Sequence, residues 1–203
     1  MNKILLGMSS VVLILTIIIG IFTRQSFVDN VSQEPYIDNE DVNVMITHEY
    51  NDVYKDYMVK TISDIEDLSD IIVKVSVDNN DLRNYFCNMT ISKVKVEYVY
   101  KGNINENKIN IIEPIYYTPE GDFAMSTDGY YWMRSGNEYI LFIDELNDIG
   151  IGDDNKIYIP TTSLFSKYNI NNTDDLAENA EGYNIRYYKM YKEFWQDIVS
   201  KYN

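Results

Sequence analysis

His48 is the only histidine in the chain, and it begins the string His48-Glu49-Tyr50-Asn51-Asp52. A zinc-protease helix has the pattern His-Glu-x-x-His, in which the second histidine lies one turn later and completes the metal-binding face. Asp52 occupies that position here, and a catalytic zinc site needs three protein ligands, which one histidine cannot supply. A Ser-His-Asp or Cys-His arrangement would also have to rest on His48 alone. The sequence therefore predicts no catalytic residue.

The segment from Pro114 to Asn137 is rich in aromatic side chains set among Gly, Ser and Asp. Rigid aromatic groups mixed with small polar ones are typical of recognition surfaces. This composition predicts a ligand-binding surface for a glycan or a partner protein. The alternative interpretation is an extended hairpin whose aromatic side chains cover the body of the domain. The candidate ligand-binding residues are Tyr116, Tyr117, Tyr130, Tyr131 and Trp132.

A second polar segment combines the oxygen ligands that Ca²⁺ prefers. Four aspartates lie within a short stretch of the chain, namely Asp144, Asp148, Asp153 and Asp154. The spacing of an EF-hand loop is absent, so a solvated turn rich in Asp and Asn is the competing interpretation. The segment remains a weak calcium candidate, and no cofactor is predicted.

Residues 1–24 predict a transmembrane anchor. The run from Ile4 to Phe22 contains no charged residue, and as a helix it would be roughly 28 Å long, close to the thickness of a hydrocarbon core. No small-residue cleavage site follows it, which favours an uncleaved anchor over a signal peptide. We expect a single-pass protein of the cell membrane whose domain lies outside the cytoplasm, or a secreted protein if the leader is cleaved.

The charge and cysteine content restrict the classes of partner. The formal net charge is -15, with 32 acidic residues against 17 basic ones. Such a surface repels phosphate backbones, so nucleic acid is not an expected partner. The expected contacts are the membrane, through the N-terminal helix, and a protein or glycan. Cys87 is the single cysteine, so an internal disulfide is impossible.

Residues 25–56 predict an acidic linker, and residues 57–203 predict one folded domain. Thr61 and Asp64 have the spacing of a capping box and predict a short helix from 61 to 68. Apolar alternation then predicts five strands, and Val99 lies out of phase in the second of them, which indicates a β-bulge. The predicted strands are 71–77, 90–100, 108–112, 138–143 and 156–159.

The C-terminal residues predict an amphipathic helix. Apolar side chains recur at steps of three and four residues, at Tyr188, Tyr191, Trp195, Ile198, Val199 and Tyr202. We expect this stripe to pack on the domain, with a face that binds a partner as the alternative. The predicted fold class is mainly β (α+β), with a preceding short helix and a C-terminal helix.

The order of these elements resembles a known group. The strings Leu68–Val75, Val94–Gly102 and Gly136–Phe142 are similar to those of uncharacterised exported domains of Gram-positive bacteria, which resemble in turn the netrin-like and TIMP-like OB-fold barrels. The resemblance implies a small five-stranded OB-like barrel over residues 61–165. Inhibitors of the TIMP type chelate zinc through an N-terminal cysteine, and Cys87 lies in mid-domain, so that mechanism does not carry over.

These observations predict a membrane-anchored extracytoplasmic binding module that is not catalytic. One alternative is an exported hydrolase that uses two carboxylates. Another is a structural component of a cell-envelope complex that uses the C-terminal helix.

Overall fold

The computed structural model describes residues 16, 32–35, 43–47, 55–78, 82–86, 89–117, 124–146, 156–173, 175–177, 182 and 184–203. Gln33–Asn203 forms one compact unit. The predicted membrane-spanning run from Ile4 to Phe22 lies outside the described residues, apart from Thr16. Within the described part, no helix has the length and apolar character needed to cross a bilayer.

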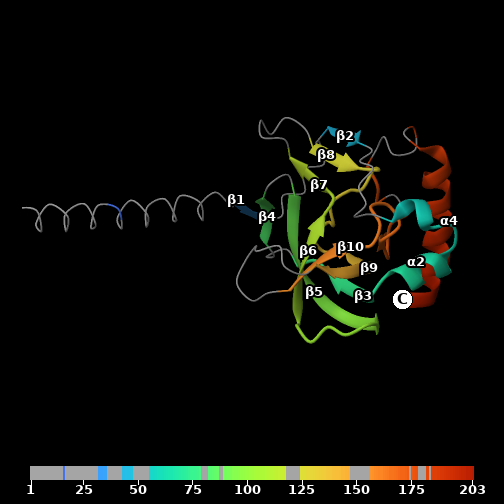
Figure 1. Cartoon of the computed structure of the whole chain (residues 1–203), viewed down its shortest axis with the longest axis horizontal. Helices are drawn as coiled ribbons and strands as arrows, with labels where there is room; N and C mark the ends of the chain where they lie inside the picture. The colour runs from blue at the N-terminus through green and yellow to red at the C-terminus, as the bar shows by residue number, and fades with distance from the viewer. Residues whose placement is uncertain are drawn as a thin grey trace, which may run out of the picture. The chain divides into compact units, whose positions relative to one another are not determined.

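Five strands close into a barrel (Figure 1). They are β3 (Ile71–Ser76), β5 (Met89–Lys101), β6 (Lys108–Glu113), β9 (Glu138–Leu146) and β10 (Ile157–Pro160). Antiparallel pairs join β3 to β5, β5 to β6, β3 to β9 and β9 to β10, while β10 pairs with β6 in parallel and completes the circle. These are the five predicted strands, so the mainly β fold with a five-stranded barrel is confirmed.

Strand β9 separates two apolar cores. Tyr139, Leu141 and Ile143 point into the barrel, where they meet side chains from all the other barrel strands. Ile140 and Phe142 point outward into a second core. Successive side chains of a strand lie on opposite faces, so a strand buried on both faces is apolar at every position. We call these two groups the inner core and the outer core.

The predicted bulge in β5 is present. Val75 pairs with Val96, whereas its neighbour Lys74 pairs with Tyr98, so Glu97 is an extra residue on β5. This extra residue shifts the alternation of side chains between Val96 and Val99, which explains why Val99 is out of phase. A second shift follows at Tyr100, because Val73 pairs with Val99 and Ile72 pairs with Lys101. The strand ends at Gly102, whose φ is +79°, and a Cβ there would lie 2.7 Å from the carbonyl oxygen of Asp70.

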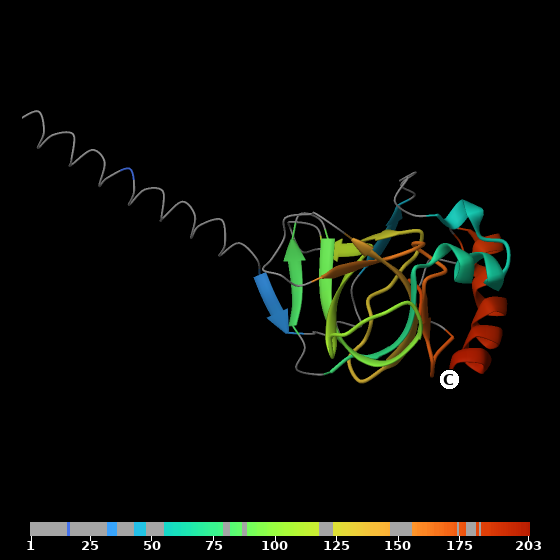
Figure 2. The ribbon, with the colours of Figure 1, turned by 60° about the horizontal axis from the view of Figure 1, so that its bottom comes forward.

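Both predicted helices are confirmed. Helix α2 (Ile62–Leu68) begins at a capping box, because the Thr61 side chain accepts from the Asp64 N–H and the Asp64 carboxylate accepts from the Thr61 N–H. Helix α4 (Ile185–Tyr202) begins at the N-cap Asn184. Figures 1 and 2 show both helices on the same side of the barrel.

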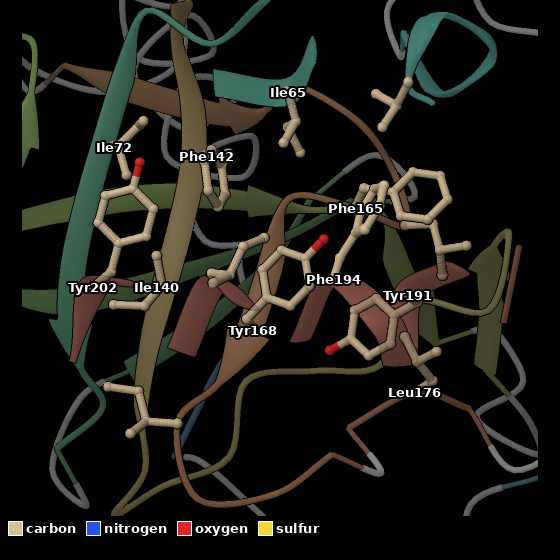
Figure 3. Packing of buried hydrophobic residues seen from close by; sticks show 14 residues of the cluster. Ile65, Ile72, Ile140, Phe142, Phe165, Tyr168, Leu176, Tyr191, Phe194 and Tyr202 are labelled. Atoms are coloured by element: carbon tan, nitrogen blue, oxygen red, sulfur yellow. The ribbon is translucent and has the colours of Figure 1, made fainter. Parts of the chain in front are cut away.

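The outer core lies beneath these helices (Figure 3). Most of its members come from α2, β3, β9, the segment 164–170 that contains β11 (Lys167–Asn169), and α4, and Val59 and Leu176 complete it. They include Ile65, Ile72, Phe142, Phe165, Tyr168, Tyr191, Phe194, Ile198 and Tyr202. The Tyr168 and Tyr191 rings stack with centroids 5.0 Å apart. The apolar stripe of α4 therefore packs on its own domain, as expected.

The segment 25–56, which the sequence predicts to be an acidic linker, contains two strands that pair with strands of the domain. Strand β2 (Val44–Thr47) pairs in parallel with β8 (Ala124–Thr127), which pairs with β7 (Ile115–Tyr117) to form a second, three-stranded sheet. Strands β4 (Leu82–Phe86) and β1 (Ser32–Pro35) extend the larger sheet beyond β5. The apolar run of β2 finds its partner some 80 positions along the chain, a distance at which local periodicity carries no information.

A one-turn helix, η1 (Asp56–Met58), follows within the same segment and buries Asp56.

Candidate functional site: an aromatic row beside buried polar clusters

The aromatic segment is held by the hairpin of β7 and β8 and by the turn that follows β8. Asp128 and Gly129 adopt positive φ values of 54° and 91°, which reverses the chain direction. The Tyr130 N–H donates to the Thr127 carbonyl at 3.0 Å, and Tyr130 forms an isolated bridge with Leu176. These bonds fix the backbone from which Tyr130, Tyr131 and Trp132 project.

The structure divides the predicted ligand-binding residues into two groups. Tyr130 and Trp132 are buried, with 1% and 3% of their surface exposed. They pack with Ile115 and Ala124 in a small core of their own. Tyr116, Tyr117 and Tyr131 remain partly exposed. The extended-hairpin interpretation therefore explains the buried pair, while three tyrosines remain accessible.

Three rings and one guanidinium group form a continuous row. The Tyr117 ring stacks on Trp132 with centroids 4.7 Å apart, and Tyr131 meets Trp132 edge to face at 5.7 Å. The guanidinium carbon of Arg134 lies 5.0 Å from the centroid of the Tyr131 ring, which is a cation–π geometry. We call Tyr117, Trp132, Tyr131 and Arg134 the aromatic row.

Glu113 is a buried carboxylate that contacts the residues next to the aromatic row. Its side chain is completely buried and accepts hydrogen bonds from the Tyr130 hydroxyl at 3.1 Å, from the Met133 N–H at 2.8 Å and from the Ser92 hydroxyl. Burial raises the pKa of Tyr130 well above its ordinary value, so the phenol stays protonated and donates to Glu113. A buried carboxylate requires such donors. This arrangement fixes the backbone at Met133.

Lys167 is the second buried charge. Its Nζ lies 2.5 Å from Oδ2 of Asp175, and both side chains are at most 1% exposed. The same nitrogen donates to the Tyr131 carbonyl at 2.6 Å and lies 4.6 Å from the centroid of the Tyr130 ring. Lys167 therefore ties the aromatic row to residues 175–177. Tyr139 adds a further tie, because its hydroxyl accepts from the Arg134 N–H at 2.6 Å.

Asp56 joins two distant loops. It accepts hydrogen bonds from the N–H groups of Ser163 and Leu164 at 2.8 and 2.9 Å and from the Ser163 hydroxyl at 2.8 Å. The Ser163 hydroxyl also lies 2.7 Å from Oδ2 of Asp128. Burial raises the pKa of Asp56, and the nearby Asp128 carboxylate adds to the rise.

The calcium candidate is only partly within the described residues. Asp144 forms an ion pair with Lys55 at 3.0 Å and accepts from the Asp70 N–H at 2.9 Å. Asp148, Asp153, Asp154 and His48 lie outside the described residues. Among the residues that the structure describes, no group of three or more His, Cys, Asp or Glu side chains is placed to hold a metal ion.

Sequence reasoning missed Glu113, Lys167 and Arg134. Glu113 directly follows the apolar strand end Ile111-Ile112, whereas Lys167 lies between Ser166 and Tyr168 and not in an apolar run. A charged residue inside an apolar run is a signal of a buried polar contact, because unpaired burial is costly. Arg134 carried no comparable signal.

Comparison of the chain with protein-family models, with curated proteins and with solved structures found no match.

Proposed function

We propose that the chain is a membrane-anchored extracytoplasmic module that binds a ligand through the aromatic row and performs no catalysis. The observation that carries this proposal is the row itself, in which Tyr117 and Tyr131 are partly exposed and fixed by stacking on the buried Trp132. Rigid aromatic side chains lose little conformational entropy on binding, so they make effective contact surfaces.

The chemistry of the buried ionisable groups supports binding over catalysis. Glu113, Asp56 and Lys167 each contact backbone N–H or carbonyl groups of the chain itself. A catalytic acid or base must reach a proton on the substrate. These three side chains instead hold loops in position, as a rigid binding scaffold requires.

The proposed fold is an OB-like barrel. The antiparallel pairs of the barrel are β3 with β5, β5 with β6, β3 with β9 and β9 with β10. The one parallel pair of the barrel joins β6 to β10. This connectivity is that of the OB-fold, a five-stranded Greek-key barrel that often binds oligosaccharides or oligonucleotides. The net charge of -15 favours a saccharide or a protein over nucleic acid as the ligand.

The test uses the full chain in detergent micelles, incubated separately with purified cell-wall polysaccharide and with solubilised envelope proteins. We expect the Tyr117→Ala/Tyr131→Ala variant to lose most of the retained ligand. The matched control is Tyr57→Ala/Tyr98→Ala, which removes two tyrosines that are 70% and 60% exposed outside the row. Equal retention by both variants, with both folded by circular dichroism, would contradict a ligand-binding role for the row.

The anchor and its orientation are tested in cells. Deletion of residues 1–24 should release the protein from the membrane fraction, because the apolar run would supply the attachment. Protease added to intact cells should degrade the domain of the full-length protein. Protection until the cells are lysed would show that the domain faces the cytoplasm.

A further inference from the structure

Arg134 differs from the other partly or fully buried basic side chains that the structure describes. Lys55, Lys74 and Lys167 each form an ion pair with a carboxylate, and Lys192 donates to the Thr173 carbonyl at 2.5 Å. Within the described part of the chain, the Arg134 guanidinium lies over the Tyr131 ring and forms no ion pair, although its charge also acts on the buried Asp175 carboxylate.

This lack of an acceptor is unusual in so acidic a protein. The chain holds 32 acidic residues against 17 basic ones, so carboxylates are abundant. Asp175, a buried carboxylate on which the charge of Arg134 acts, is bound by Lys167 at 2.5 Å and by the Asn169 amide at 3.4 Å. A guanidinium carries five N–H donors in a planar fork, and partly buried donors without acceptors cost free energy.

Arg134 is also held in place. Its N–H donates to the Tyr139 hydroxyl at 2.6 Å, and its carbonyl accepts from the Asn137 N–H at 3.3 Å. The Tyr131 ring supports one face of the guanidinium, and Arg134 is partly exposed, so a planar anion in solution can approach it. Paired N–H donors match the two oxygens of a carboxylate, and this bidentate contact is among the strongest hydrogen-bonded pairs in proteins.

We propose that Arg134 binds the carboxylate of an acidic saccharide whose sugar ring packs against Tyr131. The proposal rests on the function proposed for the aromatic row and specifies its ligand class. Arg134 supplies the charge, and the partly exposed faces of Tyr131 and Tyr117 supply the apolar contact.

Two features favour a saccharide over other acidic ligands. A protein interface of ordinary size buries about 800 Å² on each partner, far more than two partly exposed rings and one guanidinium provide. The net charge of -15 repels polymers of high charge density such as phosphate chains, whereas a saccharide with one carboxylate per unit is repelled less.

The test is a nuclear magnetic resonance titration of the full chain with sodium glucuronate. Matched probes are glucose, which has the ring without the carboxylate, and sodium acetate, which has the carboxylate without the ring. We expect glucuronate to shift the Arg134 Nε–Hε and the Tyr131 amide signals along a saturating curve. Acetate should bind several-fold more weakly, and glucose should leave the Arg134 signal unchanged.

Two variants complete the test. Arg134→Lys keeps the charge and loses the fork, and we expect it to weaken glucuronate binding by about tenfold, as followed at the Tyr131 amide. Arg186→Lys changes an exposed arginine on α4 and should leave the affinity unchanged.

Three results would overturn the proposal. The first is a glucuronate shift that does not saturate, or that is equal at Arg134 and Arg186. The second is equal binding of glucose or of acetate. The third is an Arg134→Lys variant that binds glucuronate as the wild type does. A different result would separate the two proposals. If the Tyr117→Ala/Tyr131→Ala variant retains less envelope ligand than its control while glucuronate shifts no signal of the wild type, the acidic-saccharide proposal fails and the binding function of the aromatic row stands.

Discussion

Lys167 and Asp175 form an ion pair in which neither side chain is more than 1% exposed. Removing two charges from water costs several kcal/mol for each ion. Here the cost is offset by their mutual contact, by the bond from Lys167 to the Tyr131 carbonyl and by the Tyr130 ring beneath the ammonium group. The ion pair thus fixes the aromatic row. Removing either partner of the pair would leave the other charge buried without compensation.

We expect Lys167→Met to lower the free energy of unfolding by about 3 to 5 kcal/mol, because Asp175 would remain buried without its cation. Urea denaturation followed by far-ultraviolet circular dichroism measures this change. Lys156→Met is the control, since it breaks the exposed pair with Glu145 and should change little. The double variant Lys167→Met/Asp175→Leu should recover much of the loss, and a double variant less stable than Lys167→Met would contradict this explanation.

Asp56 predicts a dependence of stability on pH. Burial raises its pKa above the ordinary value of 3.8, so the folded state binds this proton more tightly than the unfolded chain does. The contribution of Asp56 to folding is therefore greatest at acid pH and is lost as the pH rises through the folded-state pKa.

The variant Asp56→Asn isolates this effect. We expect it to be less stable than the wild type, because an amide cannot accept from both the Ser163 and the Leu164 N–H groups as the carboxyl group does. The difference in free energy of unfolding should narrow as the pH rises from about 4 to about 7. Urea denaturation of both proteins at several pH values measures it, and a gap that widens with pH would refute the assigned direction.

Helix α4 illustrates how one element closes a core. Tyr191, Phe194, Ile198 and Tyr202 are buried along one face, and the Tyr191 hydroxyl donates to the Lys167 carbonyl at 3.0 Å. Because this stripe packs against the outer core, a partner in an envelope complex would have to use another face of the helix.

We expect Ile198→Ala to destabilise the protein by about 2 to 5 kcal/mol, through lost apolar contact and the cavity left in the outer core. Gln196→Ala, on the exposed face of the same helix, is the matched control and should have almost no effect. Thermal unfolding of both variants measures the difference. Similar midpoints would mean that α4 contributes little to the stability of the outer core.

The whole domain is organised around β9, whose alternate side chains enter the inner core and the outer core. Neither core can be completed without this strand. Closure of the barrel adds a second coupling, because the parallel pair of β6 and β10 joins residues that are far apart in the sequence, Ile157 with Asn110 and Tyr158 with Ile111. Because both cores share β9, local unfolding of one core would also disrupt the packing of the other.

We therefore expect a single cooperative unfolding transition for the domain. The chain has 2 tryptophans, Trp132 beside the hairpin and Trp195 against the outer core. In the single-tryptophan variants Trp132→Phe and Trp195→Phe, fluorescence and circular dichroism should give the same urea midpoint within each protein. Two separate midpoints in either variant would show that the hairpin and the outer core unfold independently.

The five barrel strands, the capping box of α2, the bulge near Val99 and the packing stripe of α4 were all predictable from the sequence. Each depends on residues within a few positions of one another, so alternation, cap spacing and helical periodicity record it directly. The sequence by itself thus determined the elements and which of their faces are apolar.

Only the tertiary structure decided which of those elements meet. It paired β2 with β8, buried Tyr130 and Trp132, placed Lys167 against Asp175 and placed the Arg134 guanidinium over the Tyr131 ring. These outcomes depend on contacts between segments that are distant in sequence. No local pattern encodes them, because the burial of a side chain and the presence of its partner are fixed only when the barrel closes.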